Sequence, residues 1–282
     1  MSRLLRAGFV RLFKDKIFWI CNAVMLIYSL DITLDTYFAS VKFDWYSPEM
    51  DDFVFRFLAY GGILYAVFCA LFIGREYSDG TMRNKLVIGH KRLDIFLSTL
   101  IVSSVGCVIM TLFYILPAAL IGIPTIGWFK KPFQLIFITF IALLILAVAY
   151  AAMFTVLALM NSNKSVNAVI SIVLVIGLLM AGATMYNALN EPEFYSPATV
   201  MEMNDDGEIA AVEAPEMPNP YYVSGFKRQV YQILADVSPG GQSAQLTSLY
   251  SENPEKLALW SVVLTAVLTA VGVLLFSRKD LK

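Results

Sequence analysis

No Gly-x-x-x-x-Gly-Lys-Ser/Thr phosphate loop occurs anywhere in the 282 residues of this chain. Such a loop cradles the nucleotide phosphates in P-loop ATPases, so its absence predicts that the chain does not bind and hydrolyse ATP by itself. No serine stands in a nucleophile-elbow motif either, which removes the signature of a serine hydrolase of that type. We therefore expect no catalytic residues in this protein.

Histidine and cysteine are also scarce. The one histidine, His90, stands in a polar loop next to two cations, and we interpret it as a solvated loop residue instead of a metal ligand. The three cysteines, Cys21, Cys69 and Cys107, lie within apolar runs. Because buried thiols behave as small apolar packing groups, neither a metal centre nor an external disulfide framework is predicted.

Hydrophobic residues, in contrast, make up 58% of the chain, above the ~45–50% typical of soluble domains. They gather in runs that reach the ~20 residues needed to cross ~30 Å of hydrocarbon as a helix. The sequence therefore predicts an all-α polytopic membrane protein in which residues 1–282 form one transmembrane domain. Six spans are predicted, near residues 17–38, 53–73, 95–123, 133–160, 166–187 and 257–276.

The distribution of charge predicts the orientation of these spans. With the N-terminus in the cytoplasm, six spans place the C-terminus there as well, together with fourteen of the 21 basic and five of the 22 acidic residues. Cytoplasmic loops of membrane proteins carry the excess of lysine and arginine, so these cations do not predict a nucleic-acid partner. No cleaved signal peptide is expected, because no small-residue cleavage site follows the first apolar run cleanly.

The first sixteen residues have the pattern of an amphipathic helix. Leu5, Phe9, Leu12 and Phe13 share one face, and the basic residues lie elsewhere on the helix. Such a helix lies in the headgroup layer, with its cations near anionic lipids. Two interpretations stay open, a simple topological anchor and a lever that links the first span to a cytosolic partner.

One large polar segment, residues 188–256, separates the fifth and sixth spans and is predicted to be extracellular. Its first part, residues 191–220, is acidic and rich in proline, which predicts irregular structure. Residues 224–237 have an apolar stripe, with Ser224 as a candidate cap and Pro239-Gly240-Gly241 beyond them. We predict a short external helix over 224–237 that ends at this Pro-Gly-Gly sequence.

Three ionisable residues lie near the predicted outer ends of the first two spans. Asp31 and Asp35 are about one helical turn apart, and Arg56 stands near the start of the second span. Because an unpaired charge near hydrocarbon is costly, one prediction is an ion pair between Arg56 and either aspartate. The alternative is that all three side chains reach water at the membrane interface.

A dense polar stretch, residues 72–85, interrupts the apolar runs between the second and third spans. Ser78 or Asp79 can cap a helix that begins at Thr81 and runs to Leu86. Charged residues then lie just beneath the bilayer, and a push on a short helix between two spans would move both. The alternative interpretation is an ordinary basic cytoplasmic loop.

The motif in this stretch resembles the loop after the second span in permease subunits of type-2 ABC exporters. The residues that carry the resemblance are Glu76-Tyr77-x-x-Gly80-Thr81-x-Arg83-Asn84-Lys85-Leu86, followed by Gly89-x-x-Arg92. The close of the chain is similar to the close of that family, with Gly272-Val273-Leu274-Leu275-Phe276-x-x-Lys279-Asp280-Leu281-Lys282. The outer segment between spans five and six is longer than in minimal members.

The resemblance implies a complex of two permeases, identical or homologous, with two ATP-binding subunits. Those partners would bind ATP and Mg²⁺, and this chain would carry no cofactor or metal. Closure of the ATPases would push on the polar helix and switch the spans between inward- and outward-facing states. The implied coupling residues are Glu76, Tyr77, Gly80, Thr81, Arg83, Lys85 and Leu86.

The resemblance also implies a cargo class, because the family exports drugs, antimicrobial peptides and polysaccharides. We expect an amphipathic cargo, a peptide, an antimicrobial or a drug-like compound, that crosses the plasma membrane. Ion export is an alternative within the same class, since the outer loops are acidic. A channel-like or scaffold membrane protein outside the ABC class, whose polar loop only docks a regulator, is the alternative from a different class.

Overall fold

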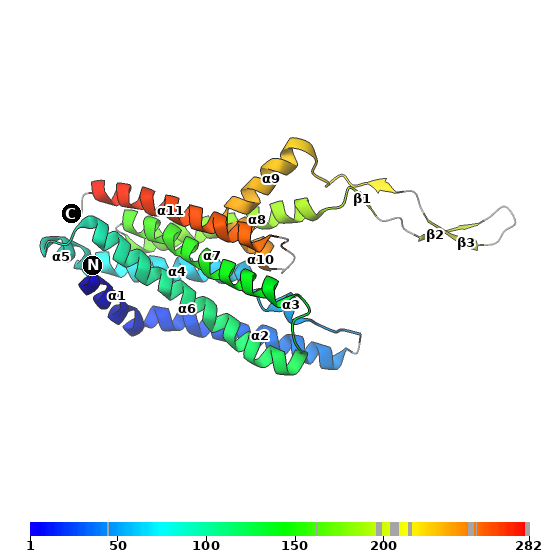
Figure 1. Ribbon diagram of the computed structural model, residues 1–282, viewed down its shortest axis with the longest axis horizontal. Helices are drawn as coiled ribbons and strands as arrows, with labels where there is room; N and C mark the ends of the chain where they lie inside the picture. Colours follow the sequence, from blue (N-terminus) through cyan, green and yellow to red (C-terminus); the bar gives the residue numbers. More distant parts are fainter. Residues whose placement is uncertain are drawn as a thin grey trace.

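The computed structural model describes residues 1–43, 45–161, 163–195, 199–203, 209–213, 216–247, 251 and 253–279, most of them in helices (Figure 1). The long helices are α2 (Lys16–Lys42), α4 (Leu58–Ser78), α6 (Arg92–Ile126), α7 (Phe133–Met160), α8 (Lys164–Asn190) and α11 (Pro254–Arg278). The short ones are α1 (Ser2–Lys14), α3 (Met50–Phe53), α5 (Thr81–Val87), α9 (Gly225–Val237) and α10 (Pro239–Thr247). The predicted all-helical class is confirmed.

Five helices of the described chain, α2, α6, α7, α8 and α11, are long and apolar enough to cross a membrane. Helix α7 has the predicted bounds, and α2, α8 and α11 extend one to four residues beyond the predicted runs at each end. Helix α6 continues through Pro124, beyond the predicted end of this span at residue 123, and stops before Gly127 with its φ of 122°. A proline in the last turn removes one backbone donor and keeps a helical φ, so the turn survives.

The predicted second span begins later than the apolar run suggests. Phe53 belongs to α3, residues 54–57 form turns, and α4 begins at Leu58. Helix α3 forms because Glu49 and Asp52 make a capping box around its first turn. The carboxylate of Asp51 accepts bonds from the backbone amides of residues 130 and 131, both at 3.0 Å, which tie α3 to the α6–α7 loop.

Helices α4 and α8 approach each other closely along a row of small residues on α4. A Cβ on Gly62 would lie 2.9 Å from the side chain of Val175, and one on Gly74 would lie 2.6 Å from that of Lys164. Alanines occupy every fourth position between these two glycines. Small residues at this spacing let two helix backbones pack closely within a membrane.

The segment after α8 forms an arm that projects from the helical bundle (Figure 1). Strand β1 (Phe194–Tyr195) pairs antiparallel with β4 (Met217–Pro218), and β2 (Thr199–Met203) pairs antiparallel with β3 (Ile209–Glu213). The prediction of irregular structure over 191–220 is therefore wrong for these strands. Aromatic and β-branched residues within the acidic segment favour extended backbone, and the antiparallel partner satisfies their hydrogen bonds.

The predicted helix over 224–237 is confirmed as α9, although Ser224 makes no side-chain cap bond. Helix α9 ends at Val237, before the Pro-Gly-Gly sequence as predicted. The same sequence begins a further helix, α10, which was not predicted and which turns back into the bundle. A Cβ on Gly240 would lie 1.9 Å from the carbonyl oxygen of Leu178 in α8, so the glycine permits a contact of two backbones. The Ser243 and Tyr150 hydroxyls are 3.0 Å apart, which joins α10 to α7.

Both chain ends lie at the same end of the bundle, where α5 also lies (Figure 1). The predicted motif at the C-terminus is described as far as Lys279, and Asp280, Leu281 and Lys282 lie outside the described residues. The three cysteines are buried and free, with the sulfurs of Cys69 and Cys107 3.9 Å apart. Their role as packing residues agrees with the sequence analysis.

Candidate functional site

The candidate site is the end of the bundle that carries α1, α5, the last turn of α4, the start of α6 and the end of α11 (Figure 1). Helix α4 ends at Ser78, and Gly80 turns the chain with a φ of 67° into α5. A φ in this left-handed region is strained for residues that carry a Cβ and is available to glycine. Gly80 therefore sets the angle between α4 and α5.

Ser78 and Asp79 do not cap α5, which corrects the prediction from the sequence. Ser78 belongs to α4, and its hydroxyl donates to the Gly74 carbonyl at 3.2 Å. The residue before α5 is Gly80, and α5 has no side-chain cap bond. The hydroxyl of Thr81 instead donates to the Glu76 carbonyl at 3.0 Å, so the first residue of α5 is bonded back to α4.

Glu76 is the centre of the site. Its side chain is 4% exposed and forms ion pairs with Lys85 of α5, at 2.6 Å, and with Arg11 of α1. The guanidinium of Arg11 also lies 4.0 Å from the centre of the Phe72 ring, a cation–π arrangement. One buried carboxylate therefore connects α1, α4 and α5.

The side chain of Arg11 is partly buried, with 32% of it exposed, and this burial affects its pKa. Desolvation lowers the pKa of its guanidinium, and the neighbouring carboxylates of Glu76 and Asp15 oppose that shift. Asp15, which is buried, forms an ion pair with Arg75 at 2.8 Å. It also accepts a bond from the Ile17 amide at 2.7 Å, which caps α2. A second ion pair thus holds the junction of α1 and α2 against α4.

The close of the chain is tied to the same end. The Tyr77 hydroxyl donates to the Leu159 carbonyl of α7 at 2.6 Å, and the Lys279 ammonium donates to that carbonyl at 2.8 Å. The ammonium also lies 4.5 Å from the centre of the Tyr77 ring, and burial lowers its pKa. Arg92, at the start of α6, donates to the Phe276 carbonyl of α11 at 3.0 Å.

Helix α5 has one face toward the bundle and one away from it. Met82 is 1% exposed and Leu86 packs against the core, whereas Arg83 is exposed. Val87 and Ile88 are each 77% exposed, although both are β-branched apolar residues. A short apolar tip beside a cation is therefore available to a partner.

The predicted outer ion pair has no counterpart in the described ion pairs. Asp31, Asp35 and Arg56 all have exposed side chains, and no described salt bridge joins the arginine to either aspartate. The pairing remains a prediction. A charge swap between Arg56 and one aspartate that restores activity would support it, and full activity of Arg56→Ala would contradict it.

The structure adds residues that sequence reasoning did not select for the site. The network also includes Arg11, Asp15, Arg75 and Lys279. Of these four, only Lys279 belongs to a motif that the sequence analysis identified, the one at the C-terminus. The available signal was the amphipathic pattern of the first sixteen residues, which left the lever interpretation open. The ion pairs of this network connect α1, α4 and α5, so the network forms a charged joint between these helices.

The fold defines a multi-pass helical membrane protein whose short polar helix is held by ion pairs at the end that carries both termini. Residues 4–182 match the family described as ABC-2 family transporter protein, and the chain belongs to this family. A search of curated proteins finds no match. Membership confirms the resemblance seen in the motif, and it implies a transmembrane subunit that works with an ABC ATP-binding subunit.

Proposed function

We propose that this chain is the permease of an ATP-driven exporter in the plasma membrane that moves an amphipathic peptide, antimicrobial or drug-like compound. Two ATP-binding subunits bind ATP and Mg²⁺, and a second permease, identical or homologous, completes the complex. The observation that carries the proposal is the buried Glu76, which joins α5 to α4 and α1 in a chain of the ABC-2 family.

In this proposal α4 also crosses the membrane, which brings the number of spans to six, and both termini are cytoplasmic. Helix α4 has 21 residues, which is about the length needed to cross the hydrocarbon core. No charged residue lies between Arg56 and Arg75. The side chains of α4 pack in the common core with those of α6 and α7, which supports a position of α4 at the same depth in the membrane as these two helices.

The proposed mechanism is transmission of force through the ion-paired joint. An ATPase that moves α5 also moves α4 through Lys85 and Glu76, and moves α1 through Arg11. The bonds from Tyr77 and Lys279 to the Leu159 carbonyl extend the same link to α7 and α11. The ATP-driven motion of a partner then biases the spans between two arrangements.

The docking surface in this proposal is the exposed tip of α5. Val87→Glu or Ile88→Glu places a charge on an apolar contact, so we expect loss of co-purification with the ATP-binding subunit and of stimulated ATP turnover. The matched control is Trp45→Glu, at an apolar residue that is 81% exposed in the loop between α2 and α3. Equal ATP turnover in Val87→Glu and Trp45→Glu would contradict docking at α5.

Coupling is tested separately from docking. Gly80→Pro requires a φ near −65°, whereas Gly80 has a φ of 67°, so the angle between α4 and α5 must change. We expect the complex with the ATPase to form while transport per ATP hydrolysed falls by roughly tenfold or more, a change of ~1.4 kcal/mol in coupling. Intact transport and coupling in both Gly80→Pro and Glu76→Ala would show that α5 does not transmit the motion.

A further inference from the structure

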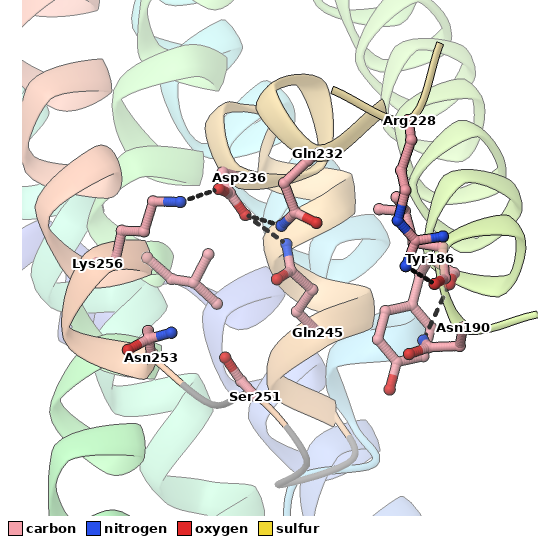
Figure 2. A pocket seen from close by; sticks show the side chains of 11 residues that line it. Tyr186, Asn190, Arg228, Gln232, Asp236, Gln245, Ser251, Asn253 and Lys256 are labelled. Carbon is pink, nitrogen blue, oxygen red and sulfur yellow. Dashed lines mark hydrogen bonds and ion pairs between the residues drawn. The ribbon is translucent and has the colours of Figure 1, made fainter. Parts of the chain in front are cut away.

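A polar hollow of about 230 Å³ lies among α8, α9, α10 and α11, away from the end that carries α5 (Figures 1 and 2). Its lining includes Tyr186 and Asn190 of α8, Arg228 of α9, Gln245 of α10 and Lys256 of α11. All of these residues lie beyond the part of the chain that matches the ABC-2 family. The hollow is therefore separate from the coupling site and needs its own explanation.

One wall of the hollow is built around a buried carboxylate. Asp236 is 4% exposed and accepts bonds from the amides of Gln232 at 3.0 Å and Gln245 at 3.3 Å, and an ion pair from Lys256 at 2.6 Å (Figure 2). Side chains from three helices thus fix this wall, and the charges of Asp236 and Lys256 cancel. A ligand meets a rigid polar surface that has no net charge at this wall.

The opposite wall carries Arg228 (Figure 2). Its guanidinium donates to the carbonyl of Leu189 at 2.9 Å and to that of Val223 at 3.3 Å. A guanidinium has five N–H donors, so these two bonds fix its position and leave donors for a ligand. No carboxylate of the described residues pairs with it. The preferred partner of such a group is a carboxylate or a phosphate.

A second hollow of about 600 Å³ adjoins the first and shares Tyr186 and Asn190 with it. Glu191 lines this second hollow, and its carboxylate accepts a bond from the Asn219 amide at 2.9 Å. No cation of the described residues pairs with Glu191. The residues that line the joined hollows therefore include a guanidinium, a carboxylate and amide side chains.

We propose that the joined hollows bind a short peptide with free ends, with its carboxylate at Arg228 and its ammonium at Glu191. The amide of Asn190 donates one N–H to the Tyr186 carbonyl, and that of Gln245 donates one to Asp236. Each amide has a second N–H and a carbonyl oxygen, which are suited to bond the peptide groups of the ligand. Inorganic phosphate, and lipids whose headgroup has no amine, lack the ammonium that Glu191 would pair with. The inference does not rest on coupling to an ATPase, since binding is measured without nucleotide.

The test measures the affinity of the full chain in nanodiscs for triglycine, for triglycine amide and for N-acetyl-triglycine by calorimetry at low salt. Triglycine is expected to bind, and each modified peptide to bind roughly tenfold or more weakly, because charge-assisted bonds are about twice as strong as neutral ones. In Arg228→Gln the amide should no longer differ from triglycine. In Glu191→Gln the acetylated peptide should no longer differ from it.

Two features keep the test independent of misfolding. Glu191→Gln keeps an acceptor for the Asn219 amide, so the backbone around it is preserved. Lys227→Gln removes the neighbouring charge on α9 at a residue that does not line the hollow, and should leave all three affinities unchanged. Arg228→Lys should retain the preference for a free carboxylate.

Three results would overturn the proposal. The first is the absence of saturable triglycine binding to the unmodified chain. The second is equal weakening by Lys227→Gln and Arg228→Gln, which would reduce the effect to general surface charge. The third is tight binding of inorganic phosphate, or of vesicles that contain anionic lipid, in place of triglycine, since this would assign the hollow to a phosphate group.

Discussion

At the scale of single residues, Glu76 combines burial with two cations from other helices. A buried carboxylate is tolerated when partners replace the water that it loses. Arg11 and Lys85 both pair with its Oε1, whereas its Oε2 is buried without a hydrogen-bond partner among the described residues. Removal of the carboxylate leaves two partly buried cations that face each other without an anion. The residue that the motif emphasised is thus also the residue on which the local fold depends.

Glu76→Gln is expected to lower the free energy of unfolding by about 2–3 kcal/mol. Loss of one partner from a buried pair costs ~3–5 kcal/mol, and the lower value follows because the side chains of Arg11 and Lys85 remain 32% and 22% exposed. Thermal unfolding in detergent measures the change.

Asp79→Asn, at an exposed carboxylate three residues away, is the control and should change stability by less than about 0.5 kcal/mol. The double variant Arg11→Met with Glu76→Gln should cost less than the two single changes added together. Additive effects would show that the two side chains do not interact.

At the scale of elements, α10 shows how two glycines decide the position of a helix: Gly240 of α10, and Gly182 of α8, where a Cβ would lie 2.3 Å from the backbone of Gly240. The backbone of α10 touches that of α8 at Gly240, so the two helices pack at a distance that excludes a Cβ. Within α10, the side chains of Ser243 and Gln242 bond to α7 and α11. Helix α10 is therefore an interior element of the bundle, although it lies in the longest polar segment.

Gly240→Ala is expected to destabilise the protein by about 3 kcal/mol or more, because the added methyl group meets backbone that cannot rotate away. The control is Gly177→Ala on α8, where a Cβ would meet no atom within 4 Å. That change should be neutral or stabilising by up to ~1 kcal/mol, since alanine favours helix. The midpoint of thermal unfolding compares the two, and a smaller loss in Gly240→Ala than in Gly177→Ala would contradict the close packing of α10 on α8.

At the scale of the whole molecule, the arrangement in space groups polar elements at the two ends of one bundle. Helices α1 and α5 and the close of α11 lie at one end, and the strand arm and the loop between α2 and α3 lie toward the other (Figure 1). An odd number of crossings would separate the two termini across the membrane, whereas α4 as a sixth crossing keeps them together. Whether α4 crosses the membrane therefore decides the topology, and this can be tested.

Accessibility of introduced cysteines measures this topology. In a chain whose three buried cysteines are replaced by alanine, Trp45→Cys and Tyr221→Cys should react with an impermeant maleimide on intact cells. Val87→Cys should react only after the membrane is opened. All three introduced positions are well exposed, at 81%, 72% and 77%. Reaction of Trp45→Cys and Val87→Cys from the same side would show that α4 does not cross.

Much of the fold could be predicted from the sequence because a helix in lipid satisfies its own backbone hydrogen bonds. The bounds of α7 and the existence of α1, α5 and α9 follow from local patterns of apolar and polar residues. The start of α4 and the beginning of α10 at Pro239 could not be predicted in this way. Both depend on contacts with distant segments, such as the amides that bind Asp51 and the carbonyl that meets Gly240.

The sequence by itself determined that this is a helical membrane protein of the transporter family, and it located the polar stretch around Glu76. The tertiary structure decided which groups that stretch contacts, Arg11 at one end of the chain and Lys279 near the other. It also decided that Arg228 and Glu191 line joined hollows. The physical reason is that the length of an apolar run decides, for each segment by itself, whether it can cross the membrane. Ion pairs, in contrast, form between side chains that only the packing of the helices brings together.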